Sequence, residues 1–272
     1  MHPELFRIGP VPIKSYGLML AISFLLGIWY VYRVTKRDGK PFDPYLTIAS
    51  LMIFSGVVGA RLFYVVFHLE EFKDNWLALF GSFDSHEFGI AGLNLYGGVL
   101  TAIVAVFWFT RRYRMNLLEV FDYFSPTLGL GLGITRIGCF LNGCCFGTPT
   151  ELPWGISFPP GSIPYSVFQS LPLHPSQLYS SLYGLLLFLL LHFMMKRKKF
   201  IGQLVAVLFM VEALFRFTIE SVRYYEDEMV IKLGGTVITY NQIIAVGLFV
   251  AGIAIYLIQR KRGALPPRTA AI

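Results

Sequence analysis

The sequence has little charge and little cysteine. Only 14% of its 272 residues are Asp, Glu, Lys or Arg, and three are cysteines. A soluble domain carries roughly 25% charged residues. The shortage of charge, together with 55% hydrophobic residues and a mean hydropathy of +0.60, therefore argues against a soluble protein. The composition is typical of a chain that crosses a membrane several times.

Seven apolar stretches are long enough to cross a bilayer, which takes about 20 residues each. They lie at about 16–32, 45–67, 92–110, 121–140, 175–195, 201–222 and 239–258. We therefore expect an all-α polytopic membrane protein that forms one membrane domain over residues 1–272. Pro126 and several glycines weaken the fourth stretch as a helix. We expect that helix to break in the glycine-rich segment around Arg136 and Asn142.

Lysine is absent from all seven stretches, and the chain has no long internal repeat. Without a lysine in a span, a retinal protein with a Schiff base is excluded. The lack of a repeat gives no support to a transporter built from inverted halves.

The basic residues indicate how the chain is oriented. Fifteen of the 23 Lys and Arg residues follow the first, third, fifth and seventh stretches, while acidic residues such as Glu70 and Glu226 lie on the opposite side. The positive-inside rule then places the N-terminus outside and the C-terminus in the cytoplasm. This placement accounts for the net charge of +7, and we expect no nucleic-acid partner.

Two segments outside the spans are unusual. Residues 68–91 are too polar to cross and rich in aromatic residues, which predicts an interfacial arm on the outer membrane surface. Residues 141–173 contain several prolines and form the longest outer segment. We interpret them as a small irregular head, with a plain extracellular connector as the alternative.

Charged side chains inside the spans are the main functional signal. Arg136 stands in an apolar, glycine-rich stretch, where an arginine costs roughly 3 kcal/mol on insertion scales. The sixth stretch carries four charges at spacings that share one helical face, namely Glu212, Arg216, Glu220 and Arg223. Arg61 lies in a similar position. These residues predict a site for an anionic headgroup at membrane depth, and the alternative is an ion-pair ladder that only holds helices together.

Other polar residues and glycines are weaker candidates. Glu119 and Asp122 enter the fourth stretch from the cytoplasmic side, where capping or pairing with a cytoplasmic arginine is the expected role. Gly129 and Gly133 are four residues apart, a spacing that favours close helix packing. Gly143 and Gly147 would allow backbone N–H groups to approach a phosphate.

His174 precedes the fifth stretch, Tyr16 lies at the outer end of the first, and Tyr96 lies in the third. A structural cap is the alternative role for the histidine, and an aromatic-belt position is the alternative for each tyrosine. The cysteines are Cys139, Cys144 and Cys145, whose spacing does not match a standard zinc motif. We expect no metal, and small packing residues or a disulfide remain as the two interpretations.

Together these segments resemble the prolipoprotein diacylglyceryl transferase family. The resemblance spans nearly the whole chain and is strongest in the run from Arg136 to Gly147, which reads RIGCFLNGCCFG. Five further motifs follow the family's order: Tyr16-Gly-Leu-Met19, Gly59-Ala-Arg61, Tyr96-Gly-Gly98, His174-Pro-Ser-Gln-Leu-Tyr179 and Phe215-Arg-Phe-Thr-Ile-Glu220 with Arg223.

The sequence departs from the family's pattern at four of these positions. Cys139 and Cys144 replace an asparagine and a glutamate of the family's run, and Tyr96 stands where many members have histidine. Glu212 occupies a position that is often tyrosine. These differences leave the arginines unchanged, but they argue against a mechanism that assigns the base to the family's histidine or a main role to its asparagine.

The resemblance implies transfer of diacylglycerol from phosphatidylglycerol to the lipobox cysteine thiol of a prolipoprotein signal peptide. Glycerol-1-phosphate leaves, and no metal or soluble cofactor is required. It also implies a multi-pass protein of the bacterial cytoplasmic (inner) membrane. A transporter or channel for an anionic substrate is the alternative function.

Within that reaction Arg136 and Arg216 are expected to hold the phosphate. Glu220 would orient Arg216 or Arg223. Tyr16 and Tyr96 would bond the glycerol or the nucleophile, and the headgroup would contact three further residues, Asn142, Gly143 and Gly147. The base that takes the thiol proton stays open among His174, Tyr96 and Glu212.

Overall fold

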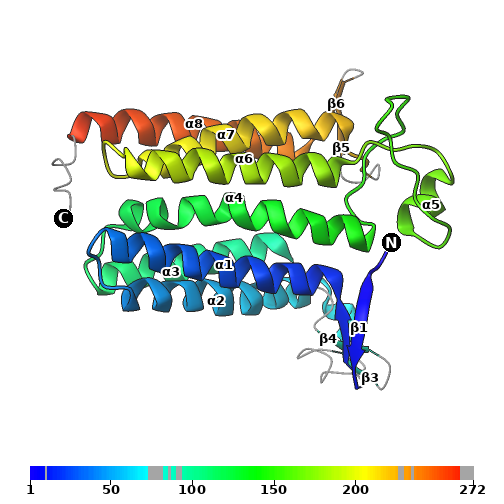
Figure 1. Ribbon diagram of the computed structural model, residues 1–272, viewed down its shortest axis with the longest axis horizontal. Coiled ribbons are helices and arrows are strands. Elements are labelled where there is room, and N and C mark those ends of the chain that lie inside the picture. The colour runs from blue at the N-terminus through cyan, green and yellow to red at the C-terminus, as the bar shows by residue number, and fades with distance from the viewer. Residues whose placement is uncertain are drawn as a thin grey trace. The chain divides into compact units, whose positions relative to one another are not determined.

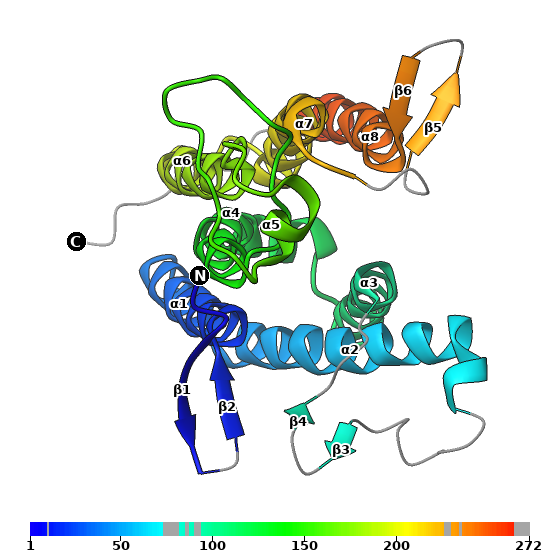
Figure 2. The same cartoon turned by 90° about the vertical axis from the view of Figure 1, so that its right-hand side faces the viewer.

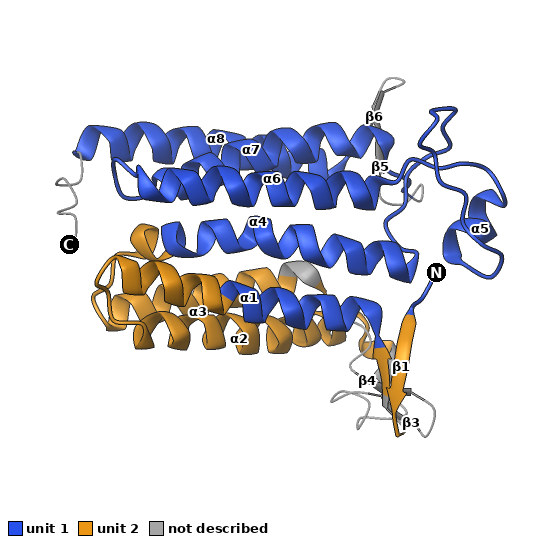
Figure 3. Ribbon diagram, viewed as in Figure 1, with its two compact units in different colours: residues 1–3, 14–27, 121–272 blue, residues 4–13, 28–120 orange. Residues whose placement is uncertain are grey.

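The computed structural model describes residues 1–9, 11–72, 82–84, 87–89, 94–225, 230–233 and 236–263. Most of the described chain is helical (Figure 1). It divides into two compact units (Figure 3). Unit 1 comprises residues 1–3, 14–27 and 121–272, and unit 2 comprises residues 4–13 and 28–120.

The helices are α1 (Ser15–Arg37), α2 (Asp43–Phe67), α3 (Leu95–Arg112), α4 (Leu117–Asn142), α5 (Ile163–Phe168), α6 (Ser176–Lys196), α7 (Gln203–Ile219) and α8 (Tyr240–Arg262), with short 3-10 helices η1 (Leu69–Phe72) and η3 (Glu220–Val222). The strands are β1 (Glu4–Ile8), β2 (Val11–Lys14), β3 (Ser82–Asp84), β4 (Glu87–Gly89), β5 (Val230–Leu233) and β6 (Thr236–Thr239). They form three two-stranded hairpins, β1-β2, β3-β4 and β5-β6. The all-α expectation is therefore corrected in these connectors, where short strands pair locally.

Five of the described helices are long and apolar enough to cross a membrane: α1, α2, α4, α6 and α8. The two other long helices fall short of that criterion. The 18-residue α3 ends in Arg111 and Arg112, and α7 has 17 residues. The sixth predicted stretch, 201–222, extends through α7 into η3. The chain is thus a polytopic helical membrane protein.

In unit 2, α2 and α3 pack closely through small residues. A side chain on Gly59 would collide with Thr101, and the Thr101 hydroxyl donates to the Ser55 carbonyl at 2.8 Å. Most of the predicted interfacial arm, 68–91, lies outside the described residues. The described parts there are η1 and the hairpin of β3 and β4, which pairs Ser82 with Gly89.

In unit 1, α4, α6, α7 and α8 run side by side (Figure 2). A Cβ on Gly184 of α6 would lie 2.5 Å from the Gly133 nitrogen and 2.9 Å from the Gly129 oxygen. The Ser181 hydroxyl donates to the Gly133 carbonyl at 2.6 Å. The packing role predicted for Gly129 and Gly133 is therefore confirmed, because only glycines allow these two backbones to meet.

Helix α4 is longer and more regular than the predicted stretch, 121–140. It continues through Pro126 and the glycines as far as Asn142, and it ends where Gly143 adopts a φ of +78°. The helix therefore ends within the segment around Arg136 and Asn142 where the break was predicted. Close packing against α6 favours the continuous helix despite its weak intrinsic propensity.

The predicted head, 141–173, has a small core of its own. Phe146, Phe158 and Leu173 are buried together, and the Leu173 backbone pairs with both Pro149 and Ile156. The segment extends beyond one end of the unit 1 helices and includes α5 (Figure 1). It is an ordered structure in which each backbone bridge fixes the loop that follows α4.

Candidate active site

Arg136 lies near the end of α4 with no acidic partner. Its Nη1 is 4.0 Å from the Cys139 sulfur, and its side chain also bonds the Cys145 thiol. In the part of the chain that the structure describes, no Asp or Glu lies within 4.0 Å of this guanidinium. A half-buried cation without a carboxylate is available to an anionic ligand.

The loop after α4 is held in shape by the first turn of α6. Gln177 donates to the Cys144 carbonyl at 2.9 Å, and the Ser176 hydroxyl donates to the Cys145 carbonyl at 2.7 Å. Cys145 adopts a φ of +59°, which is uncommon for a residue with a side chain. These two tethers stabilise the turn and fix where the neighbouring thiols lie.

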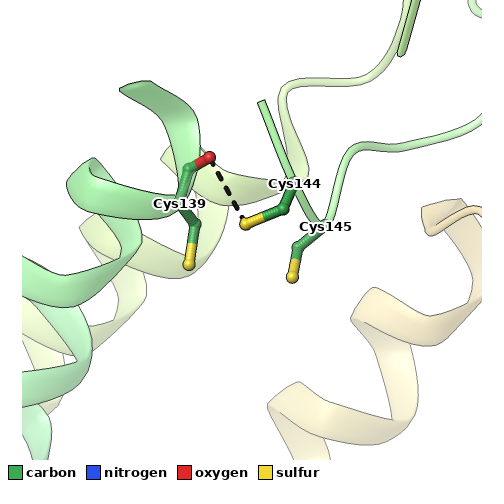
Figure 4. A group of neighbouring side chains, drawn as sticks. All are labelled: Cys139, Cys144 and Cys145. Atoms are coloured by element: carbon green, nitrogen blue, oxygen red, sulfur yellow. Dashed lines mark hydrogen bonds between the residues drawn. The ribbon is translucent and has the colours of Figure 1, made fainter. Parts of the chain in front are cut away.

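The three cysteines lie next to one another at this turn (Figure 4). All are free thiols, and their sulfur atoms lie within 4.8 Å of one another. Hydrogen bonds from Cys139 and Cys144 lower the pKa of the Cys145 thiol, and the nearby guanidiniums of Arg136 and Arg223 lower it further. The three cysteines therefore form no disulfide in this structure, which contradicts the disulfide interpretation.

Glu220 is the centre of a second charged group. Its side chain is 0% exposed, and its Oε1 lies 3.2 Å from Arg216 Nε and 3.7 Å from Arg223 Nη1. The two cations and one carboxylate leave this group with an excess positive charge. The buried Nε of Arg223 has no hydrogen-bond partner among the described residues. Glu220 thus aligns two guanidiniums without neutralising both.

Three neutral side chains complete the surroundings of Glu220. Tyr225 and Thr239 donate to its two oxygens at 2.8 and 2.9 Å, and Asn241 donates at 3.4 Å. Burial raises the pKa of Tyr225 to about 12, so its hydroxyl keeps the proton that it donates. Glu212, which shares the helical face, instead accepts a hydrogen bond from Tyr183 at 2.9 Å.

Gly147 connects the two charged groups. It forms a backbone bridge with Arg223, and its nitrogen donates to the His174 carbonyl at 3.1 Å. A Cβ at this position would lie 2.6 Å from both the His174 Cβ and the Val222 carbonyl. The absence of a side chain therefore allows the segment after the cysteines to lie against the end of α7. The guanidiniums of Arg136 and Arg223 both lower the pKa of the Cys145 thiol.

Other predicted residues of unit 1 lie around this connection. Asn142 is the last residue of α4, and its side chain bonds the Cys144 thiol. Tyr16, the second residue of α1, is 42% exposed and packs its backbone on Gly138. The His174 ring lies 3.4 Å from the Tyr179 hydroxyl, which also accepts from Trp154.

Two predicted residues belong to unit 2. The Arg61 guanidinium lies over the Tyr64 ring, 5.7 Å from its centroid. Tyr96 is the second residue of α3, but its side chain lies outside the described part of the structure.

The carboxylates at the start of α4 pair with lysine, where the sequence predicted capping or an arginine partner. Glu119 lies 2.7 Å from Lys40, and Asp122 lies 3.2 Å from Lys198. Capping is confirmed for Asp122, which accepts hydrogen bonds from the backbone at the start of α7, including Gly202 N at 2.7 Å. Both carboxylates therefore have structural roles.

Sequence reasoning missed the neutral residues that surround Glu220. Tyr225 lies only five residues after Glu220 and could have been found by its proximity, since a tyrosine is a suitable donor to a buried carboxylate. Thr239 and Asn241 carry no such signal, because the fold alone brings them to the site. Gln177, which supports the cysteine loop, lies in the motif from His174 to Tyr179 that the resemblance had already indicated.

Comparison with known proteins identifies the family. The model of the family described as prolipoprotein diacylglyceryl transferase matches residues 3–258. The chain is 33% identical to the phosphatidylglycerol–prolipoprotein diacylglyceryl transferase of Vibrio cholerae serotype O1, over 100% of this chain and 96% of that protein. The enzymes of that name from Vibrio parahaemolyticus and Aliivibrio salmonicida are also 33% identical, over 97% and 96% of this chain and 92% and 89% of theirs. This protein therefore belongs to the prolipoprotein diacylglyceryl transferase family.

Proposed function

We propose that this protein transfers the diacylglyceryl group of phosphatidylglycerol to the lipobox cysteine thiol of a prolipoprotein. The substrate sulfur attacks the glyceryl carbon that carries the phosphate. A C–S bond forms as the C–O bond between the glyceryl carbon and the phosphate breaks. Glycerol-1-phosphate leaves, and the proton of the substrate thiol ends on this departing phosphate. Membership of the family, over nearly the full chain, is the observation that carries this conclusion.

The charge distribution of unit 1 supports the assignment of the phosphate site. The departing phosphate gains negative charge in the transition state, and fixed cations in a water-poor site stabilise such charge. Arg136 has no carboxylate partner in the described chain, and Arg216 and Arg223 share a single one. We assign Arg136 and Arg216 to the phosphate, and Glu220 to the orientation of Arg216 and Arg223.

The remaining assignments follow the positions of the residues. Asn142, Gly143 and Gly147 form the turn next to Arg136, where backbone N–H groups and an amide can contact the headgroup. Tyr16, Arg61 and Tyr96 are proposed as further lipid contacts from the first, second and third spans. His174 is proposed as a group that holds or deprotonates the substrate thiol.

We propose seven spans, with α3 and α7 as the shorter two. Basic residues lie in the last turns of α1, α3, α6 and α8, which supports a cytoplasmic location for these ends. The ion pair of Asp122 and Lys198 joins the start of α4 to the connector after α6 and agrees with this alternation. The protein would then lie in the bacterial cytoplasmic membrane with its N-terminus outside.

The test is a transfer assay with phosphatidylglycerol labelled in its diacylglyceryl group and a lipobox peptide bearing one cysteine. Arg136→Ala and Arg216→Ala should each lower kcat by roughly 10²–10³, about 2.7–4 kcal/mol, the loss expected for one transition-state contact. Arg197→Ala is the matched control. This exposed arginine follows the last residue of α6, whereas the proposed site lies near the first turn of that helix.

Detergent micelles have no sealed compartment and cannot report transport. The appearance of the label on the peptide in micelles would therefore demonstrate transfer and not transport. No thioether product from the folded protein would contradict the proposed function. Near-normal rates in both folded arginine variants would contradict the phosphate assignment alone.

A further inference from the structure

The cysteine cluster has the geometry of a soft-metal site. Three sulfurs bound to one Zn²⁺ at ~2.3 Å lie roughly 4 Å from one another. The sulfurs of Cys139, Cys144 and Cys145 lie within 4.8 Å of one another, next to each other at the turn (Figure 4). Small side-chain rotations would bring all three into contact with one ion.

The fold favours this arrangement for reasons that the sequence spacing hides. Cys139 comes from the last turn of α4, while Cys144 and Cys145 come from the turn that reverses the chain. The Cys144 nitrogen donates to the Cys139 carbonyl at 3.1 Å, which folds the turn back over the helix end. The tethers from Ser176 and Gln177 hold that turn, so the three ligands are positioned before any ion binds.

The surrounding charge suits a metal–thiolate complex. Zn²⁺ with three thiolates carries a net charge of −1, because each thiol releases its proton as its bond to the metal forms. Arg136 contacts the Cys139 sulfur at 4.0 Å, and Arg136 and Arg223 both act on Cys145. The negative charge of the complex would thus be stabilised by the guanidiniums of Arg136 and Arg223, which in the described chain have between them only the Glu220 carboxylate that Arg223 shares with Arg216.

We propose that Cys139, Cys144 and Cys145 bind one thiophilic d¹⁰ cation, of which Zn²⁺ is the representative, and that the bound ion competes with phosphatidylglycerol. Thiolate ligands select this class of metal. The anionic complex pairs with the Arg136 guanidinium, to which the phosphodiester of the lipid would otherwise bind. Competition with the lipid rests on the proposed function, whereas metal binding by the three thiols does not.

The binding experiment uses the full-length protein in detergent without substrate. Co²⁺ reports thiolate ligation by its absorption, and Zn²⁺ then displaces it in a titration. We expect one equivalent to bind to the reduced protein and binding to be lost in the triple variant C139S/C144S/C145S. That variant keeps all five histidines and all 16 carboxylates of the chain, so it measures ion binding elsewhere.

Cys144→Ser is the second variant. It replaces a thiol that makes only sulfur hydrogen bonds among the described residues, to the Cys139 carbonyl and with neighbours such as Asn142 and Cys145. It should bind Zn²⁺ far more weakly even if the triple variant does not fold. Undiminished stoichiometric binding in a folded Cys144→Ser or triple variant overturns the site. The absence of binding to the reduced wild type overturns it as well.

The competition is measured in the transfer assay at increasing Zn²⁺, with each variant compared with its own metal-free rate. The KM for phosphatidylglycerol should rise with Zn²⁺ while kcat stays constant, and a chelator should restore it. If the transfer rate of the wild type stays constant when Zn²⁺ saturates its site, the proposed competition is overturned. An inactive enzyme that still binds Zn²⁺ through these thiols contradicts the proposed function and leaves the metal site supported.

Discussion

Two buried carboxylates of unit 1 have very different surroundings. Asp122 pairs with Lys198, which is 4% exposed, and accepts hydrogen bonds from Gly202, Leu204 and Val205 at 2.7 to 3.1 Å. Its one negative charge meets one positive charge. Glu220 is equally buried, but it serves two arginines, and one of them keeps a buried nitrogen without a partner.

The difference supports the proposal that the group around Glu220 binds a ligand, whereas the pair at Asp122 is structural. At Asp122 one carboxylate matches one ammonium, and neither side chain is among the buried groups of the described chain that lack a hydrogen-bond partner. Around Glu220 the excess charge and the unused Arg223 donor can be satisfied by a ligand, and Arg136 nearby has no acidic partner in the described chain. Incomplete pairing of the cations is what we expect of the proposed anion site.

The strongest way to test this comparison is Asp122→Asn. The substitution leaves Lys198 buried beside a neutral amide, which should lower the free energy of unfolding by about 3–5 kcal/mol. Thermal unfolding in detergent would show the loss as a lower Tm. The folded fraction should keep its transfer rate, because Asp122 caps α7 at its start and the proposed site lies at its end.

Glu119→Gln is the control for that variant. Glu119 lies in the same helix, but its pair with Lys40 is 25% and 40% exposed, so its loss should cost at most about 1 kcal/mol. Equal Tm shifts for the two variants would show that the burial of Asp122 has no special effect.

The sequence was most informative for charged residues, because few positions in a membrane span tolerate them. A charged residue in an apolar stretch must meet a partner or a polar cavity. Arg136, Arg216, Glu220 and Arg223 could therefore be singled out before any geometry was known. Helix positions were also accessible, because apolar length is a local property and each predicted stretch coincides with a helix in its described part.

Contacts between distant segments were not accessible. Thr239 reaches Glu220 because β6 returns the chain to the end of α7. The cysteine cluster depends on positive φ at Gly143 and Cys145. The sequence indicates a helix break here, but it does not indicate that Cys145 adopts a positive φ. The continuous α4 shows the converse, since close packing with α6 overrides the weak helix propensity around Pro126.

Glu220→Gln tests the second half of the comparison. The amide keeps the acceptor for Tyr225 or Thr239 but removes the charge that aligns Arg216 and Arg223. We expect kcat to fall by roughly tenfold to a hundredfold, about 1.4–2.7 kcal/mol. The KM for phosphatidylglycerol should not rise, since the unpaired guanidiniums still attract the phosphate.

The fall in Tm should be smaller than for Asp122→Asn, because Arg216 is 27% exposed and water can solvate it. Glu220→Asp, which restores the charge, should recover part of kcat. A purely structural carboxylate would instead lower Tm and leave kcat of the folded enzyme unchanged.

The smallest expected effect belongs to C139S/C144S/C145S in metal-free buffer. The nucleophile of the proposed reaction is the substrate thiol, and serine keeps a small hydroxyl donor at each position. Transfer should therefore change by less than about fivefold, or about 1 kcal/mol, when measured with a chelator present and corrected for the folded fraction. A loss as large as that of Arg136→Ala in a folded triple variant would show that a thiol of this chain takes part in the reaction. The cluster next to Arg136 would then belong to the catalytic apparatus, and the site would be complete only with its cysteines.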